Sequence, residues 1–291
     1  MRKIFAALLF LFALPKAETQ EIIEAVETAE NTDGTDVAEN TENAETAEKK
    51  YSYIPLYYAF DGILLNSGKT LIHNYGLNSA LMVTGTYALI QTGTDWEWNR
   101  FAYRHKPITE IGLYAYYVGF TVPFAAPLAL YGIGLGLEDL KLQTAAVAVT
   151  QASLISTVFT TSIKAFTGRK HSDVWDGGKK DYSGDFAFGF MKRGAFAGWP
   201  SGHASAAWAM AATLTEFYSS IPLAAGLYGY AFYISASASV SFHWFSDVCA
   251  GALFGYTIGK MTGRYFNKEY NKESQFSLVV LPDRVMIVKG F

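Results

Sequence analysis

The sequence predicts an all-α protein: a polytopic transmembrane bundle of about six core helices, followed by a small C-terminal β-hairpin. Of the 291 residues, 51% are hydrophobic and 17% are charged, and the apolar residues occur in blocks. Residues 111–137, 142–163 and 217–246 contain no Asp, Glu, Lys or Arg. Each stretch is at least about as long as the roughly 20 residues that a helix needs to cross a bilayer. A soluble all-helical enzyme with unusually apolar core helices is the alternative.

Two segments precede the predicted helical domain. Residues 1–17 carry a basic pair and then a short apolar stretch, which predicts a signal peptide, with an uncleaved anchor as the alternative. Residues 18–50 are rich in Glu, Thr, Ala and Asn and lack aromatic side chains. Such a composition buries too little apolar surface to offset its ordering entropy, so we expect an acidic disordered tether.

The helical domain is expected over residues 51–266 and the tail over 267–291. Its predicted parts, in chain order, are a short helix or half-span at 51–65, a helix at 77–91, an aromatic interface loop at 94–106, spans at 111–136 and 142–166, a long loop at 167–199, and helices at 203–218, 223–240 and 243–261. In the tail, the pattern at 276–280 and 285–289 favours a β-hairpin.

Composition excludes several classes of function. The formal net charge of −3 combines an acidic N-terminal region with basic residues near the motifs, and it does not suggest a nucleic-acid partner. Cys249 is the only cysteine, so no intramolecular disulfide can form. Neither HExxH nor CxxC occurs, so we expect no metal and no cofactor. The oligomeric state cannot be derived from these features.

The tetrapeptide Pro-Ser-Gly-His at 200–203 marks the start of a predicted helix. Ser201 is a good N-cap, and Gly202 allows an anion to approach the main chain closely. Unpaired N–H groups at a helix N-terminus favour negative charge, and His203 adds a proton donor within one turn. This motif predicts an anion site with acid chemistry. A capped helix with an incidental histidine is the alternative.

Two further stretches carry ionisable side chains. His243 and Asp247 are four residues apart, which places them on one helix face, where the carboxylate can orient the ring. A hydrogen-bonded polar pair in a bundle core would look the same. Lys164 begins a cation-rich helix exit that continues to His171. A lysine that snorkels to a basic rim is the alternative there.

Alternating spans would bring Lys164, His203 and His243 to one face of the bundle. That face suits a phosphate group, because cations and helix N–H groups can hold its oxygens. One histidine can then attack phosphorus while the other protonates the leaving oxygen.

The order of these motifs resembles that of the type 2 phosphatidic acid phosphatase (PAP2) superfamily. The motifs are Lys164 with Arg169, then PSGH, then His243-x-x-x-Asp247 followed by Ala250-Gly251. The resemblance covers about residues 111–260 and implies a helical membrane domain. It implies that His243 is the nucleophile, that Asp247 orients it and that His203 is the general acid. It also implies phosphate binding by Lys164, Ser201 and Gly202.

Two positions depart from the family pattern. The arginine-proline pair that ends its first motif is replaced by His171 and Ser172, and the serine-arginine pair of its third motif by Ala236 and Ser237. An arginine fork holds two oxygens at once, which these residues cannot do. We therefore expect Arg169 or Lys170 to substitute as phosphate ligands, and His171 to contribute if it is protonated.

The resemblance implies a metal-independent phosphatase that cleaves a lipid-linked phosphate or pyrophosphate monoester through a phosphohistidine. Its expected substrates are a phospholipid or a polyprenyl phosphate. The resemblance also implies a multi-pass protein of a bacterial inner membrane, with the site facing the periplasm or the outside. Two alternatives remain: a catalytically weakened or dead membrane scaffold that binds the anion, and a haloperoxidase-like enzyme that uses vanadate.

Overall fold

A computed structural model describes residues 53–72, 75–172, 180–273, 276–281 and 284–289. By its internal contacts the chain divides into the units Met1–Tyr57 and Tyr58–Phe291. The predicted signal peptide at 1–17 and the predicted tether at 18–50 lie outside the described residues.

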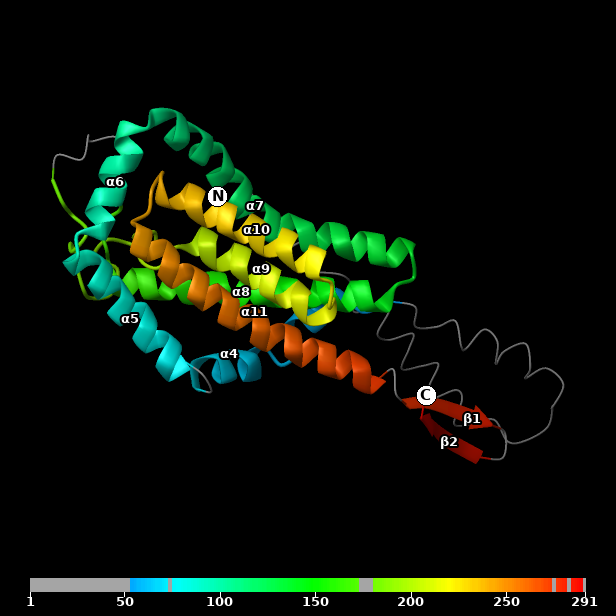
Figure 1. Cartoon of the computed structure of the whole chain (residues 1–291). Coiled ribbons are helices and arrows are strands. Elements are labelled where there is room, and N and C mark those ends of the chain that lie inside the picture. Colours follow the sequence, from blue (N-terminus) through cyan, green and yellow to red (C-terminus); the bar gives the residue numbers. More distant parts are fainter. Residues whose placement is uncertain (1–52, 73–74, 173–179, 274–275, 282–283, 290–291) are drawn as a thin grey trace. The chain divides into compact units, whose positions relative to one another are not determined.

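The described part of the second unit is helical up to the tail (Figure 1). Its elements in chain order are η2 (Leu56–Phe60, which begins just before the unit boundary), α4 (Ile63–Ile72), α5 (Tyr75–Gln91), α6 (Thr94–Arg104), α7 (Lys106–Gly136), α8 (Leu140–Thr167), α9 (Gly202–Phe217), α10 (Ile221–Ser239), α11 (Phe245–Glu273), β1 (Phe276–Leu281) and β2 (Arg284–Lys289).

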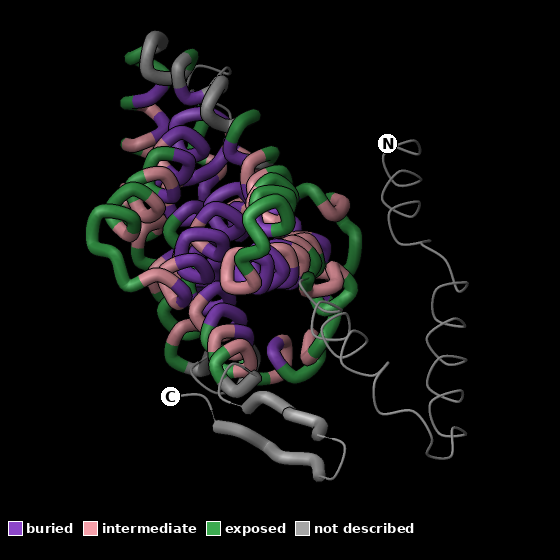
Figure 2. The backbone as a smooth tube through the Cα atoms, turned by 90° about the vertical axis from the view of Figure 1, so that its right-hand side faces the viewer, coloured by how far each residue is buried: buried purple, intermediate pink, exposed green. Residues whose placement is uncertain are grey.

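Helix α9 occupies the centre of the bundle and packs against α7, α8, α10 and α11. Its sequence is rich in alanine, and 12 of its 16 residues are buried. Small side chains allow neighbouring helix backbones to approach closely, which suits a helix surrounded on several sides. Figure 2 shows the resulting concentration of buried backbone in the middle of the bundle.

A stripe of glycines on α11 faces α9. Gly251, Gly255, Gly259 and Gly263 recur every four residues and therefore share one helix face. A β-carbon at Gly255 would overlap the carbonyl oxygen of Ser205 on α9, and the other three glycines meet α9 backbone oxygens in the same way. The two helices are thus locked in one register along their length.

Serine side chains join α8 to its neighbours inside the apolar bundle. Ser156 shares a buried 2.7 Å hydrogen bond with Ser205 of α9. Ser153 donates across 2.9 Å to the carbonyl oxygen of Pro123 in α7. That carbonyl has no intrahelical partner because residue 127 is a proline and carries no N–H. A neighbouring helix therefore satisfies the group that the proline frees, as is usual for prolines in apolar bundles.

The structure corrects the predicted elements at four places. Where a short helix or half-span is expected at 51–65, the structure has η2 (Leu56–Phe60) and a separate helix α4 (Ile63–Ile72) that continues beyond 65. Residues 94–104, expected as an interface loop, form helix α6. Its buried residues Asp95, Asn99 and Ala102 have helical spacing, which the aromatic and basic side chains around them obscured. Helix α7 begins at Lys106 rather than at 111, and α11 continues to Glu273 rather than ending at 261.

Among the described residues, one helix is long and apolar enough to cross a bilayer by length and composition. This is α8, and 56% of its most apolar window is buried inside the protein. A shorter apolar stretch, Thr121–Gly136, lies in α7. Gly, Ser and Tyr side chains keep the hydropathy of the other helices moderate, so about six spans remain a prediction.

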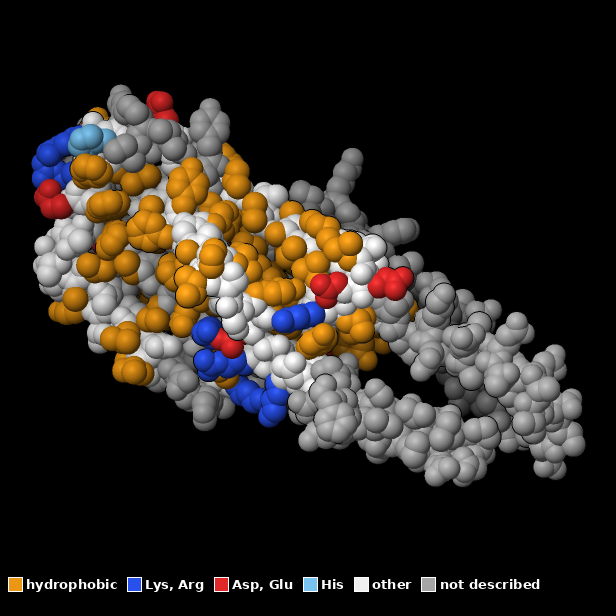
Figure 3. Space-filling view, turned by 45° about the vertical axis from the view of Figure 1, so that its right-hand side comes forward, with side chains coloured by type: hydrophobic (Ala, Val, Ile, Leu, Met, Phe, Trp, Pro, Cys, Tyr) orange, Lys and Arg blue, Asp and Glu red, His pale blue; other side chains and the backbone are white. Residues whose placement is uncertain are grey.

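The described surface is nevertheless strongly apolar. In Figure 3 hydrophobic side chains are spread over the described part of one face, and charged side chains gather at a few places. Leu64, Leu77 and Ile221 are among the large apolar residues with at least 70% of their area exposed. An extensive apolar surface of this kind marks contact with a membrane or another protein.

The tail contains two strands. β1 pairs antiparallel with β2, with Val280 opposite Val285 and Phe276 opposite Lys289. The strands fall in the stretches 276–280 and 285–289 for which the sequence suggests a hairpin, and residues 282–283 between them lie outside the described residues.

The glycine stripe gives a stability prediction. We expect Gly255→Ala to lower the free energy of unfolding by about 1–3 kcal/mol, because the added methyl group overlaps the Ser205 carbonyl. Gly85→Ala in α5 is the matched control, since open space surrounds that position, and it should raise stability by up to about 1 kcal/mol. Thermal unfolding of both variants in detergent measures the difference. Equal melting temperatures for the two variants would contradict the close packing of α9 and α11.

Candidate active site

The predicted site residues come from three segments that meet at one end of the bundle. Lys164 lies in the last turn of α8, His203 in the first turn of α9, and His243 in the turn between α10 and α11. The backbone N–H of Ser201 donates to the carbonyl oxygen of Asp247 across 2.9 Å. The start of α9 is therefore bonded directly to the start of α11.

His243 and Asp247 form a buried pair. Nδ1 of the ring lies 3.3 Å from Oδ2 of the carboxylate, which also accepts a 3.0 Å hydrogen bond from the Trp244 N–H. Burial, the largest cause, lowers the pKa of His243 to about 4. The nearby Lys164 cation also lowers this pKa, whereas the hydrogen bond to Asp247 raises it. Near neutral pH the ring is therefore uncharged, and its Nε2 is left as the nitrogen that can attack.

His203 and Lys164 lie close to this pair. The centroids of the His203 and His243 rings are 6.4 Å apart. The Lys164 ammonium nitrogen lies 4.0 Å from the place that a β-carbon on Gly202 would take. Ser201 is the N-cap of α9, and its hydroxyl accepts from the Ala204 N–H at 3.5 Å. A lysine, two imidazoles and a helix N-terminus are thus brought together.

Arg169 differs from its predicted role as a phosphate ligand. Its side chain is fully buried, and its donors are directed at protein acceptors. Nη1 donates to Asp247 at 2.5 Å and to Ser246 at 2.8 Å. Nη2 donates to Asp95 and to the Ser183 carbonyl, both at 2.7 Å, and Nε also donates to that carbonyl, at 2.9 Å. A guanidinium has five N–H donors, so these five contacts leave none for a phosphate oxygen.

His171 occupies the position of the first missing arginine. Its ring centroid is 5.4 Å from that of His243. Nδ1 lies 3.0 Å from the Phe242 carbonyl oxygen, and Nε2 lies 2.5 Å from the Phe196 carbonyl oxygen. Both ring nitrogens of His171 therefore face backbone carbonyl oxygens, and neither is directed at a phosphate.

Neither Ser237, at the position of the second missing arginine, nor Lys170, the other expected phosphate ligand, provides an arginine-like fork. Ser237 donates its hydroxyl proton to the Tyr233 carbonyl of its own helix, 2.8 Å away. The Lys170 ammonium group lies over the Tyr182 ring, 3.4 Å from the centroid. Within the described ranges, no group of three or more His, Cys, Asp and Glu residues is placed to hold a metal ion.

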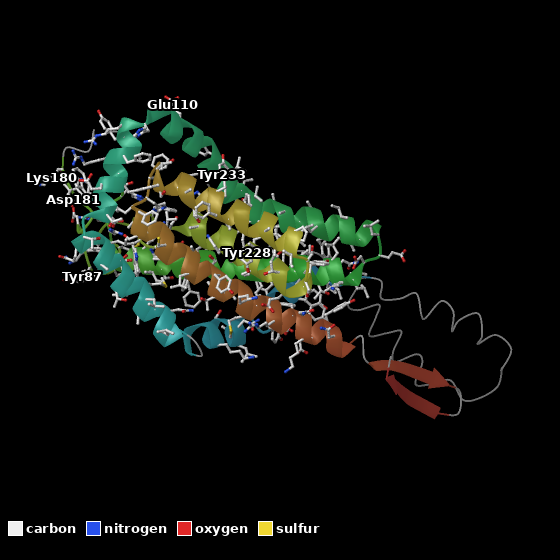
Figure 4. The ribbon with its side chains drawn as sticks, viewed as in Figure 1. Tyr87, Glu110, Lys180, Asp181, Tyr228 and Tyr233 are labelled. Atoms are coloured by element: carbon white, nitrogen blue, oxygen red, sulfur yellow. The ribbon has the colours of Figure 1, made fainter. Side chains whose placement is uncertain are left out.

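The described end of the long loop, residues 180–199, folds back on the exit of α8. Backbone N–H groups of Ala187 and Gly198 donate to Gly168 and Arg169, and Arg193 bonds both the Gly168 carbonyl and the Asp185 carboxylate. Figure 4 labels Lys180 and Asp181 of this loop at the left-hand end of the ribbon. Four large apolar side chains of the loop remain exposed: Phe188, Phe190, Met191 and Phe196.

Asp95 is the site-proximal residue that the sequence analysis did not identify. It lies in the first turn of α6, and its side chain is fully buried against Arg169 and Ser246. A sequence signal was present, because Asp95, Asn99 and Ala102 are spaced as one helix face after Gly93. Its partner Arg169 is 74 residues away, and no local pattern predicts such a contact.

Comparison with known proteins gives one family match. A family model described as "PAP2 superfamily" matches residues 145–271, which include the end of α8, the PSGH motif and the His243–Asp247 pair. No curated protein and no solved structure matches the chain.

The buried ring of His243 gives a titration prediction. Its imidazole resonances, assigned by their loss in His243→Ala, should titrate with a midpoint near pH 4, well below the value of about 6.5 for a solvated ring. Asp247→Asn should lower the midpoint further, because the carboxylate stabilises the protonated ring. Nitrogen-15 NMR of histidine-labelled protein in detergent measures both midpoints. A wild-type midpoint at or above 6.5 would mean that the ring is not buried.

Proposed function

Because residues 145–271 form a PAP2 superfamily domain, and membership implies phosphatase-like activity, we propose that the chain is a metal-independent phosphatase of a lipid-linked phosphate or pyrophosphate monoester. The observation that supports this most is the meeting of His243, His203 and Lys164 at one end of the bundle. A nucleophile, an acid and a cation are the groups that phosphoryl transfer needs when no metal takes part.

The proposed reaction has two steps. Nε2 of His243 attacks phosphorus and forms an N–P bond, while the bond to the leaving oxygen breaks and that oxygen takes a proton from His203. For this step His203 starts as the imidazolium, a form that the negative charge of the bound phosphate favours against the burial that disfavours it. Water then attacks the phosphohistidine, with His203 accepting its proton, and phosphate and the free ring are released. Asp247 holds Nδ1–H throughout and stabilises the positive ring of the intermediate.

Lys164 and the N-terminus of α9 are the proposed ligands of the phosphate oxygens. The ammonium group lies near Gly202, where the first unpaired N–H groups of the helix begin. Lys164 and the helix N-terminus replace the two arginines of the family pattern with groups that make fewer directed hydrogen bonds.

Exposed apolar surface supports a lipid-linked substrate. The loop beside the site presents Phe188, Phe190 and Phe196, and the last of these is 78% exposed. Aromatic side chains at such a position suit the interface between headgroups and acyl chains. We propose a multi-pass protein of a bacterial inner membrane, with the site on the periplasmic or outer side, on the family resemblance.

A phosphate-release assay tests the proposal. Purified wild-type protein should release phosphate from at least one member of a panel of phospholipid phosphates and polyprenyl pyrophosphates, and vanadate should inhibit it. His243→Ala should lower kcat by about a thousandfold or more, since the nucleophile is lost. Gel filtration in detergent checks that the variant is folded. Equal rates for wild type and variant would remove the proposal.

A binding protein without turnover is the second candidate function. The observation that favours it is the lack of a free guanidinium group for phosphate. Ser237, which replaces a family arginine, donates to its own helix, and Arg169 pairs with two carboxylates. Loss of a transition-state donor typically costs about 10²-fold or more in rate. In this case the pocket would hold a phosphate headgroup and release nothing.

Restoring the arginines separates the two candidates. If the wild type binds inorganic phosphate but hydrolyses no substrate in the panel, the double variant His171→Arg with Ser237→Arg should gain hydrolysis. If the wild type is active, the same variant should raise kcat by about tenfold or more through added transition-state donors. Phosphate release by the two proteins under one condition measures this. An active wild type would eliminate the binding-only candidate.

A further inference from the structure

Three buried charged side chains from distant parts of the chain form a connected group that reaches His243, the candidate nucleophile, through Asp247. Asp95 of α6 and Asp247 of α11 bind opposite ends of the Arg169 guanidinium, at 2.7 and 2.5 Å. The side chains of all three are fully buried. Ser246 closes the group, with its N–H and hydroxyl donating to Asp95 at 2.8 and 2.6 Å.

The charges of these three buried side chains do not cancel. Arg169 and Asp247 alone would be neutral, and Asp95 adds a second carboxylate to the same cation. The group therefore carries a net charge of about −1 while His243 is neutral. A buried excess charge is costly unless something offsets it, and such groups gather at functional sites.

The excess charge matters when the ring becomes positive. Attack on phosphorus through Nε2 turns His243 into a cationic, phosphorylated ring that still holds Nδ1–H against Asp247. If Arg169 were unpaired on its other side, its charge would cancel most of the field of Asp247 at the ring. With Asp95 bound to Arg169, the carboxylate of Asp247 keeps its effect on the ring.

We propose that Asp95 is a positioning residue of the nucleophile, which neutralises Arg169 so that Asp247 can stabilise the positive ring that His243 forms on attack. This inference rests on the proposed phosphatase function. Asp95 touches neither the ring nor a substrate. It acts through Arg169 and through its bonds to Ser246, which fix the first turn of α11 next to Asp247.

The titratable and charged groups around His243 come from several elements of the bundle. They are Asp247 of α11, Lys164 of α8, His203 of α9, Asp95 of α6, and Arg169 and His171 of the connecting loop. Substitution of Asp95 changes one of these charges and leaves the other groups in the protein unchanged.

Asp95→Asn tests the proposal, because asparagine keeps the shape of the side chain and removes its charge. We expect kcat for phosphate release to fall by about tenfold or more with KM changed less than about threefold. The NMR titration midpoint of His243 should fall by about half a pH unit or more, since a negative charge that favours the protonated ring is gone.

A second variant reverses the effect. Asp95→Asn with Arg169→Gln removes one charge of each sign, so the Asp247 carboxylate is left without a cation. We expect the midpoint of His243 in this double variant to return to the wild-type value or exceed it. A purely structural role for Asp95 would give no such reversal, because the double variant loses more contacts than the single one.

Glu216→Gln is the matched control. Glu216 of α9 is a largely buried carboxylate that pairs with Lys260 and Arg264, near the other end of the helix. Its loss should change stability and leave kcat and the midpoint of His243 at the wild-type values.

The possible results distinguish failure of the Asp95 proposal from failure of the phosphatase function. An Asp95→Asn protein that titrates and turns over like the wild type would overturn the proposal. If that variant does not fold, the double variant decides, and a midpoint below that of the wild type would count against the proposal. A wild type that releases no phosphate from any substrate defeats the phosphatase function, whereas the titration series still measures the charge balance.

Discussion

The ion pair between Arg169 and Asp247 is the contact on which the candidate site depends. It joins the exit of α8 to the first turn of α11, and Asp95 adds α6 to the same guanidinium. Removal of one partner from a buried ion pair typically costs about 3–5 kcal/mol, because the other charge is left unpaired. The loop that carries Arg169 also carries His171 and binds the segment before the PSGH motif through Gly198. Arg169 therefore sets the relative position of all three motifs.

The close packing of α9 against α11 at the glycine stripe also fixes the positions of the motifs that these two helices carry. His203 lies at the start of α9 and Asp247 near the start of α11, and both helices are in close contact from Gly251 onward. Because Gly251 lies against the Ser201 carbonyl, the packing of the bundle continues directly into the site. A small change in the register of the two helices would move the two histidines relative to each other. The apolar bundle and the polar site are thus parts of one packed unit.

Much of this arrangement could be predicted from local patterns. The PSGH motif and the spacing of His243 and Asp247 act within one helical turn, so the sequence alone indicates a capped helix and a paired ring. The helices at 77–91, 142–166, 203–218 and 223–240 follow from long apolar runs between polar segments. Helix α6 could not be found in this way, because its aromatic and basic side chains are as typical of an interface loop. The role of Arg169 was also missed, since its partners are 74 and 78 residues away and basic side chains near a motif favour a phosphate ligand by default.

The loss of two arginines and the burial of a third have a common consequence. The groups that the site offers to the proposed phosphate are a lysine, a helix N-terminus and imidazoles. Arg169 is not available, because its N–H groups donate to Asp95, Asp247, Ser246 and Ser183. Point charges attract phosphate without fixing its orientation, whereas a guanidinium fork does both. Orientation must then come from the nucleophile itself and from whatever holds the rest of the substrate. In the proposed reaction, these two constraints come from the His243 ring, held by Asp247 with Asp95 acting through Arg169, and from the exposed apolar loop as the proposed contact for a lipid tail.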